Sequence, residues 1–173
     1  MSPNTTRPIE LLVTALAWSS NYDDAEILIM NALESTSTIP THLCLHRELG
    51  NLINYYYPQP HSTNVLSRIQ HQYNLYLNSV ESKQIVVPLE HVIGVHNDMA
   101  LLLQSQGQIA NAVSHFQRAL DLDTDTTNYK ILTNYGLLLS KLDSTKIKQS
   151  IDMQRKAVSI CKSLSITSLH AKN

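Results

Sequence analysis

The sequence has little of the two residues that shape tight turns, with four glycines and six prolines among 173 residues. An average protein uses roughly twice as much of the two together. This scarcity disfavours a turn-rich all-β fold and favours long helices. It also disfavours glycine-rich phosphate loops, and neither a P-loop, a GxGxxG fingerprint nor a GxSxG elbow is present. We therefore expect no catalytic residues and no cofactor.

Charge is scarce as well. Only 16% of the residues are charged, and thirteen basic against fourteen acidic residues leave a net charge of −1. Such a balance provides no field that would recruit nucleic acid or an anionic membrane. No apolar run reaches the 18 residues of a candidate membrane span. The apolar content of 43% is ordinary, which predicts a folded chain with a sizeable core.

Cysteine is limited to Cys44 and Cys161, and neither lies in a CxxC motif. We expect two small buried side chains in a reducing, cytoplasmic environment. The apolar stretch over residues 11–17 faintly resembles a signal peptide. Glu10 interrupts it, however, and an amphipathic helix is the better interpretation.

Amphipathic stretches separated by prolines and small polar residues dominate the chain. Pro40 and Pro88 suit the first turn of a helix, and Pro58 with Pro60 ends the helix before them. Residues 84–87 are too few to build a sheet. The pattern predicts an all-α protein with helices over residues 7–18, 22–34, 40–57, 63–80, 88–106, 109–122, 128–142 and 146–162.

Small residues recur at matching places in every second helix. Spacings of four and then three put each set on one helical face, where small side chains let a neighbouring helix approach closely. The sets are Ala25, Ile29 and Ala32; Ala112, Phe116 and Ala119; and Ser150, Gln154 and Ala157. The alternate helices pair a large residue with a small one, in Leu49-Gly50, Met99-Ala100 and Tyr135-Gly136.

Residues 106–123, QGQIANAVSHFQRALDLD, with the preceding HNDMALLLQS, resemble a tetratricopeptide (TPR) repeat, in a longer-period form similar to that of kinesin light chains. Residues 21–33 and 134–160 are weaker copies, and 43–56 is a degenerate one. The resemblance implies a right-handed α-α superhelix of about four helix pairs in one domain spanning 1–173. The pairs would cover 7–34, 40–80, 88–122 and 128–162. The resemblance is weak over 58–87, and we expect the stretch from Tyr55 to Val87 to be irregular or mobile.

The same resemblance implies a protein-protein interaction module that binds a peptide or a helix of a partner protein in a concave groove, in a scaffold or adaptor role. No small-molecule substrate is expected. The family's groove positions stand three before and one after the motif glycine or alanine. Carried over to this sequence, they are Arg47 and Asn51, Asn97 and Leu101, and Thr133 and Leu137, with Lys130 and Asn134 also facing inward. Asparagine amides both donate and accept, which suits them to a peptide backbone.

Several alternatives stay open. Arg47, Asn51 and Lys130 partly match the carboxylate clamp of chaperone-binding TPR domains, but Asp98 and Asn134 depart from it. The chain could also be a regulatory or substrate-recruiting segment of a larger enzyme. His42 and His46 stand one helical turn apart, a spacing that can hold zinc, but no third ligand is recognisable and we expect no metal.

Overall fold

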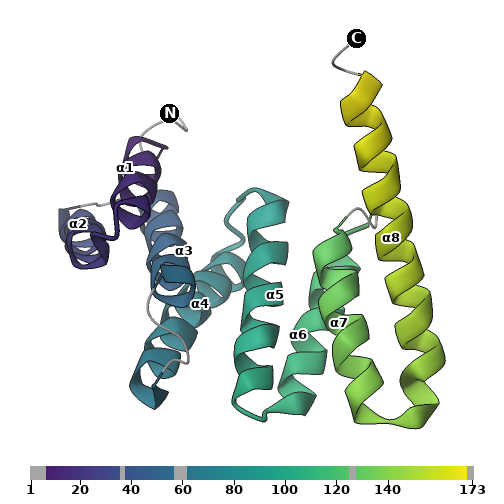
Figure 1. Ribbon diagram of the computed structural model, residues 1–173. Helices are drawn as coiled ribbons and strands as arrows, with labels where there is room; N and C mark the ends of the chain where they lie inside the picture. The colour runs from purple at the N-terminus through teal and green to yellow at the C-terminus, as the bar shows by residue number, and fades with distance from the viewer. Residues whose placement is uncertain (1–6, 36–37, 57–61, 125–127, 171–173) are drawn as a thin grey trace. The chain divides into compact units, whose positions relative to one another are not determined.

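The computed structural model describes residues 7–35, 38–56, 62–124 and 128–170, which are mostly helical with no strand among them (Figure 1). The prediction of an all-α fold built from helix pairs is confirmed. The helices are α1 (Arg7–Trp18), α2 (Tyr22–Ser35), α3 (Ile39–Tyr56), α4 (Thr63–Lys83), α5 (Leu89–Ser105), α6 (Ile109–Leu122), α7 (Tyr129–Leu142) and α8 (Ile147–His170), with a 3-10 turn, η1 (Ser144–Lys146), before α8. None of the described helices is long and apolar enough to cross a membrane.

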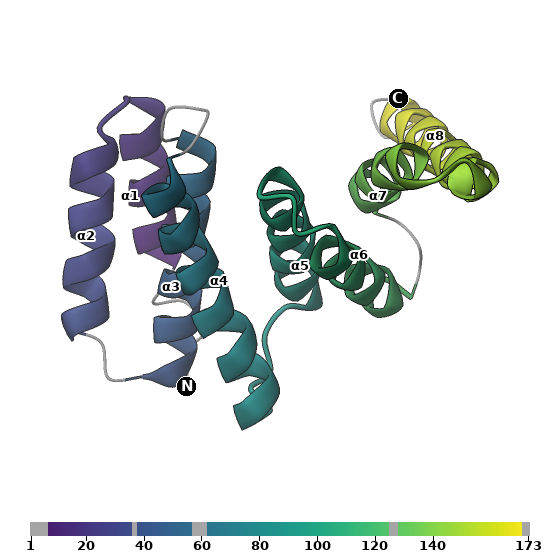
Figure 2. The same ribbon diagram turned by 90° about the horizontal axis from the view of Figure 1, so that it is seen from below.

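The helices divide between two compact units, Met1–Pro88 with α1 to α4 and Leu89–Asn173 with α5 to α8. Within each unit the odd-numbered helix packs against the helix that follows it, so that each unit holds two pairs (Figures 1 and 2). That all four pairs form a single domain stays a prediction.

The first unit is held together by the small-residue face of α2 and by the pairing of α3 with α4. Ala25, Ile29 and Ala32 are all buried, as their spacing predicts. Glu26 of α2 also forms an ion pair with Arg68 of α4, so a polar contact joins the two pairs. The small side chains of Ala25 and Ala32 let the helices of the first pair approach closely.

The structure confirms the helix predicted over 63–80, so the expectation of irregular structure from Tyr55 to Val87 is wrong for α4. This helix begins after Ser62, whose hydroxyl accepts a hydrogen bond from the backbone N–H of Val65. It ends at Gln84 in the left-handed conformation, with φ 48° and ψ 41°. Tyr73 and Tyr76 are completely buried. Large aromatic side chains therefore take the place of the small-residue motif whose absence made this segment look irregular. Residues 57–61 of the same region lie outside the described residues.

The second unit contains the best-formed repeat. Gly107 takes a positive φ of 74° in the turn between α5 and α6, and Ala112, Phe116 and Ala119 of α6 are fully buried. The Phe116 ring stacks on Tyr135 of α7 at a centroid distance of 5.4 Å, which connects this pair to the next. Burial of these side chains confirms the repeat pattern that the sequence shows most clearly.

The last pair differs from the sequence prediction in two respects. The helix α8 continues to His170 instead of ending near residue 162. Cys161 is exposed and Cys44 is half-buried, so the expectation of two buried thiols is wrong. Ser150 and Ala157 are buried in α8, and Cys161 lies one turn beyond Ala157 on the same side of the helix. It is nevertheless exposed, at the edge of a depression that it borders with Thr133 of α7.

Candidate protein-binding surface

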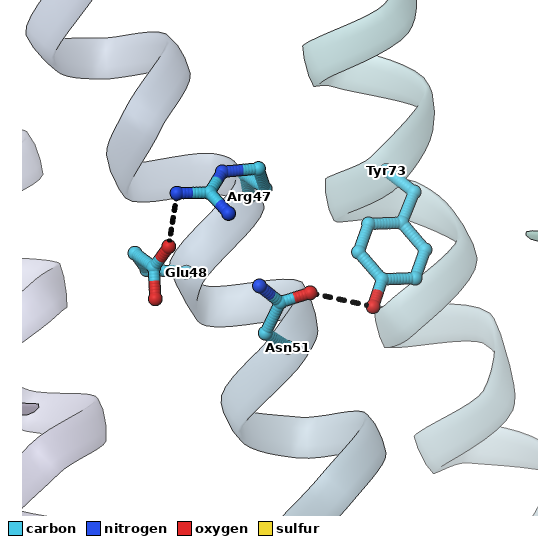
Figure 3. A network of polar contacts seen from close by, with 4 residues as sticks. All are labelled: Arg47, Glu48, Asn51 and Tyr73. Carbon is cyan, nitrogen blue, oxygen red and sulfur yellow. Dashed lines mark hydrogen bonds and ion pairs between the residues drawn. The ribbon is translucent and has the colours of Figure 1, made fainter. Parts of the chain in front are cut away.

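In the first unit, the predicted binding residue Asn51 is fixed by Tyr73. Its side-chain oxygen accepts a hydrogen bond of 2.9 Å from the Tyr73 hydroxyl, which crosses from α4 to α3 (Figure 3). The tyrosine ring reaches this position because it passes directly over Gly50. A side chain at residue 50 would block that path, since an added β-carbon would lie 2.6 Å from Cε1 of Tyr73. The amide of Asn51 is thus held in one orientation, with its NH₂ group on the other side.

Arg47, one helical turn before Asn51, is also positioned by a neighbour. Its guanidinium forms an ion pair of 2.6 Å with Glu48, and both side chains are only 15% exposed (Figure 3). An adjacent carboxylate offsets much of the positive charge that Arg47 would offer to an acidic ligand. We therefore expect Arg47 to contribute shape and a directed hydrogen bond more than net attraction.

In the second unit, α5 and α7 are linked by the two predicted asparagines. The Nδ2 of Asn134 donates to Oδ1 of Asn97 over 3.0 Å. The Nδ2 of Asn97 in turn donates to Oδ1 of the buried Asp98 over 3.1 Å. This chain of amide and carboxylate groups orients both asparagines, because each amide donates one N–H within it.

Apolar side chains stand beside this polar chain. Leu101 follows Asn97 by one turn and is 39% exposed, while Leu137 follows Asn134 and is 45% exposed. Gly94 precedes Asn97 by one turn, and a β-carbon built there would meet no heavy atom within 4 Å. Lys130 is exposed one turn before Asn134. The α5–α7 surface, which we define by Gly94, Asn97, Leu101, Lys130, Asn134 and Leu137, therefore combines open space, oriented amides and accessible apolar area.

Each sequence-predicted residue lies on the helix expected for it. Arg47 and Asn51 belong to α3 in the first unit, and Asn97 and Leu101 to α5 in the second. Thr133 of α7 is half-buried and borders a depression of about 440 Å³ whose other lining residues belong to α8. Of the predicted residues, the structure joins Asn97 to Asn134 directly.

The histidines that raised the question of a metal have other partners. Nδ1 of His46 lies 2.8 Å from Oε1 of Gln72, and the His42 ring meets the His46 ring edge to face at 5.9 Å. Burial lowers the pKa of His46, against the opposing effect of its Gln72 hydrogen bond. Among the described residues, no group of three or more histidine, cysteine or acidic side chains is placed to share a metal ion.

A second histidine contact was not foreseen from the sequence. The Nδ1 atoms of His96 in α5 and His115 in α6 lie 2.9 Å apart, so one imidazole donates an N–H and the other accepts it. Burial, together with the nearby His115 and Arg118, lowers the pKa of His96 to about 4. His96, Tyr73 and Gly94 all belong to the surroundings of the predicted residues. The sequence identifies none of them, because each depends on how one helix is rotated against the next.

Comparison with known proteins supports the fold. No protein-family model matches the sequence. A search of curated proteins finds no match. Among solved structures, the chain is similar to a TPR-like helical repeat protein, the MamA RS-1 ArsTM double mutant, with a TM-score of 0.58 and 20% sequence identity. The similarity covers 94% of this chain and 79% of that one. The chain therefore has a TPR-like helical-repeat fold.

Proposed function

We propose that this protein is a non-enzymatic interaction module that binds a segment of another protein through the exposed faces of its odd-numbered helices. The α5–α7 surface carries the proposal. Its two asparagines are held by the Asn134–Asn97–Asp98 chain of hydrogen bonds, and two exposed leucines flank them. Oriented amides suit a peptide backbone, and accessible apolar area suits the side chains of a bound segment.

The charges near this surface favour one kind of ligand over another. The buried Asp98 carboxylate lies against Asn97, at the place where a clamp for a terminal carboxylate would need a neutral or positive group. We therefore favour an internal peptide or helix over a C-terminal carboxylate. Lys130 would then select acidic residues near one end of the bound segment. Arg47 and Asn51 offer a separate set of polar groups on the first unit.

A displayed library of random peptides of about 15 residues, panned against the full chain, would provide the probes. For an enriched peptide, we expect Asn97→Ala or Leu137→Ala to weaken binding about tenfold, since an interfacial hydrogen bond or leucine contact is worth about 1–1.5 kcal/mol. Isothermal titration calorimetry would give the affinities. Ser114→Ala, at an exposed position of α6, is the matched control and should leave them unchanged.

Two results would refute this function. One is that no peptide is enriched on this chain more strongly than on a control helical protein of similar size. The other is that enriched peptides bind the Asn97 and Leu137 variants as tightly as the wild type, provided that circular dichroism shows those variants to be folded.

A further inference from the structure

The outer side of α2 is apolar in the middle and acidic around it. Ile27 and Met30 are 57% and 44% exposed, and they line a shallow depression with Asp23, Glu26 and Asn31. Asp23, Ile27, Met30, Asn31 and Glu34 fall on one side of the helix, opposite the buried Ala25, Ile29 and Ala32. We call these five residues the α2 face. The helix contains four acidic residues and no lysine or arginine.

The outer side of α8 has the same organisation with the opposite charge. Ile147, Ile151 and Val158 are exposed on one side, at positions turned away from the buried Ser150 and Ala157. Arg155 and Lys162 stand beside them, and with Ile151 and Val158 they border a depression of about 490 Å³. We call Ile147, Ile151, Arg155, Val158 and Lys162 the α8 face. The only acidic residue of the helix, Asp152, lies 3.6 Å from Arg155.

These two faces complement each other. Each presents isoleucine with another large apolar side chain at helical spacing, an arrangement that allows one helix to pack along another. Each apolar stripe is flanked by charges that would attract the flanking charges of the other. The whole chain has a net charge of only −1, so no general repulsion opposes contact between two copies.

From this match we propose that a second copy of the chain is the occupant, with the α2 face of one copy docked on the α8 face of the next. The contact is heterologous, because it joins two different surfaces. Each bound copy then retains one unused α2 face or α8 face, so that further copies can add and the assembly grows until it closes into a ring or remains open. This contact uses neither the α5–α7 surface nor its hydrogen bonds.

Sedimentation velocity of the full chain at several concentrations and at low salt tests the proposal. We expect the wild type to form dimers and larger species as concentration rises, and to lose them in high salt, where exposed charge attractions are screened. Ile27→Lys or Val158→Lys places a charge inside one apolar stripe. Either should weaken self-association at least tenfold. Both positions are exposed, so the fold should survive, which circular dichroism would verify.

A mixture of the two variants gives the sharpest result. The Val158→Lys chain keeps an intact α2 face, and the Ile27→Lys chain keeps an intact α8 face. The two should therefore form a one-to-one dimer and nothing larger, because the remaining faces both carry added lysine. Ser114→Lys, with the same charge change on an exposed residue of α6, should associate like the wild type.

Several outcomes would overturn the proposal. The wild type could stay monomeric at low salt and high concentration. Ile27→Lys alone could abolish association while Val158→Lys does not, which would indicate a symmetric contact between two α2 faces. Both variants could associate like the wild type, which would assign these faces to some other partner or to none. Finally, the mixture could fail to yield a dimer.

Discussion

The ring of Tyr73 lies so close to Gly50 that a β-carbon on residue 50 would come within 2.6 Å of Cε1 and 2.8 Å of Cδ1. The ring cannot easily move away. It is completely buried, and its hydroxyl is bonded to Asn51. Glycine is therefore required at position 50 for packing, in a helix where alanine would otherwise be preferred.

Because of this contact, alanine substitutions at two glycines should change the free energy of unfolding in opposite directions. Gly50→Ala should lower the free energy of unfolding by about 1–3 kcal/mol, the usual cost of overpacking a core. Gly94→Ala, also within a helix but beside open space, should raise it by about 0.5–1 kcal/mol, because alanine loses less conformational entropy. Urea denaturation followed by circular dichroism would measure both. Equal effects of the two changes would contradict the packing described for Tyr73.

The alanines of α6 offer a second comparison. Ala112 and Ala119 are fully buried, whereas Ala110 on the same helix is exposed. We expect Ala112→Leu or Ala119→Leu to destabilise the protein by about 1–3 kcal/mol through overpacking. Ala110→Leu should change stability by less than about 0.5 kcal/mol, as is usual for surface positions. Thermal unfolding of the three variants checks this. Wild-type stability in all three would show that the buried face of α6 has been assigned to the wrong residues.

The buried His96 predicts a dependence of stability on pH. Its pKa is about 4 in the folded protein, against an ordinary value of 6.5. Between these values the unfolded chain binds the proton and the folded chain does not, so stability must fall as pH falls from 6.5 toward 4. His115 and Arg118 of α6 face the imidazole and oppose its protonation. The lowered pKa of His46 acts in the same direction.

Denaturant unfolding at a series of pH values would measure the effect. We expect His96 alone to lower the free energy of unfolding by about 2 kcal/mol as the pH falls from 7.5 to 5. His96→Gln cannot take up the proton, so its stability should vary less over the same range. If the wild type and His96→Gln lose equal stability over that range, the pH dependence arises elsewhere.

How much of the fold could be predicted from the sequence differs from one helix to another. The helices and the buried face of α6 were predictable, because Ala112, Phe116 and Ala119 follow the period of a helix and need no knowledge of their neighbours. The packing of α4 could not be predicted. The large ring of Tyr73 lies where the other helix pairs pack through small side chains. Only the distance between α3 and α4 reveals that Gly50 accommodates it.

The binding residues show the same division. The positions of Asn97 and Asn134 on successive odd-numbered helices followed from the resemblance to TPR repeats. Their mutual hydrogen bond depends on the distance and rotation between α5 and α7, which one sequence does not specify. The sequence analysis assigns Arg47 to ligand binding, whereas the carboxylate of the adjacent Glu48 is within ion-pair distance of it. Neighbouring residues in a helix point in different directions, so this pairing requires particular rotamers that no spacing rule predicts.

The left-handed backbone at Gln84 is a consequence of how little glycine the sequence contains. Gln84 has φ 48° and Ser20 has φ 63°, although side chains other than glycine adopt this region at a cost of roughly 1 kcal/mol each. Glycine serves this purpose at residue 107 and at no other described position. The chain therefore does not lie at its stability maximum. Glycine in place of Gln84, at the end of α4, would increase the free energy of unfolding. It would do so without altering any core side chain or either proposed binding surface.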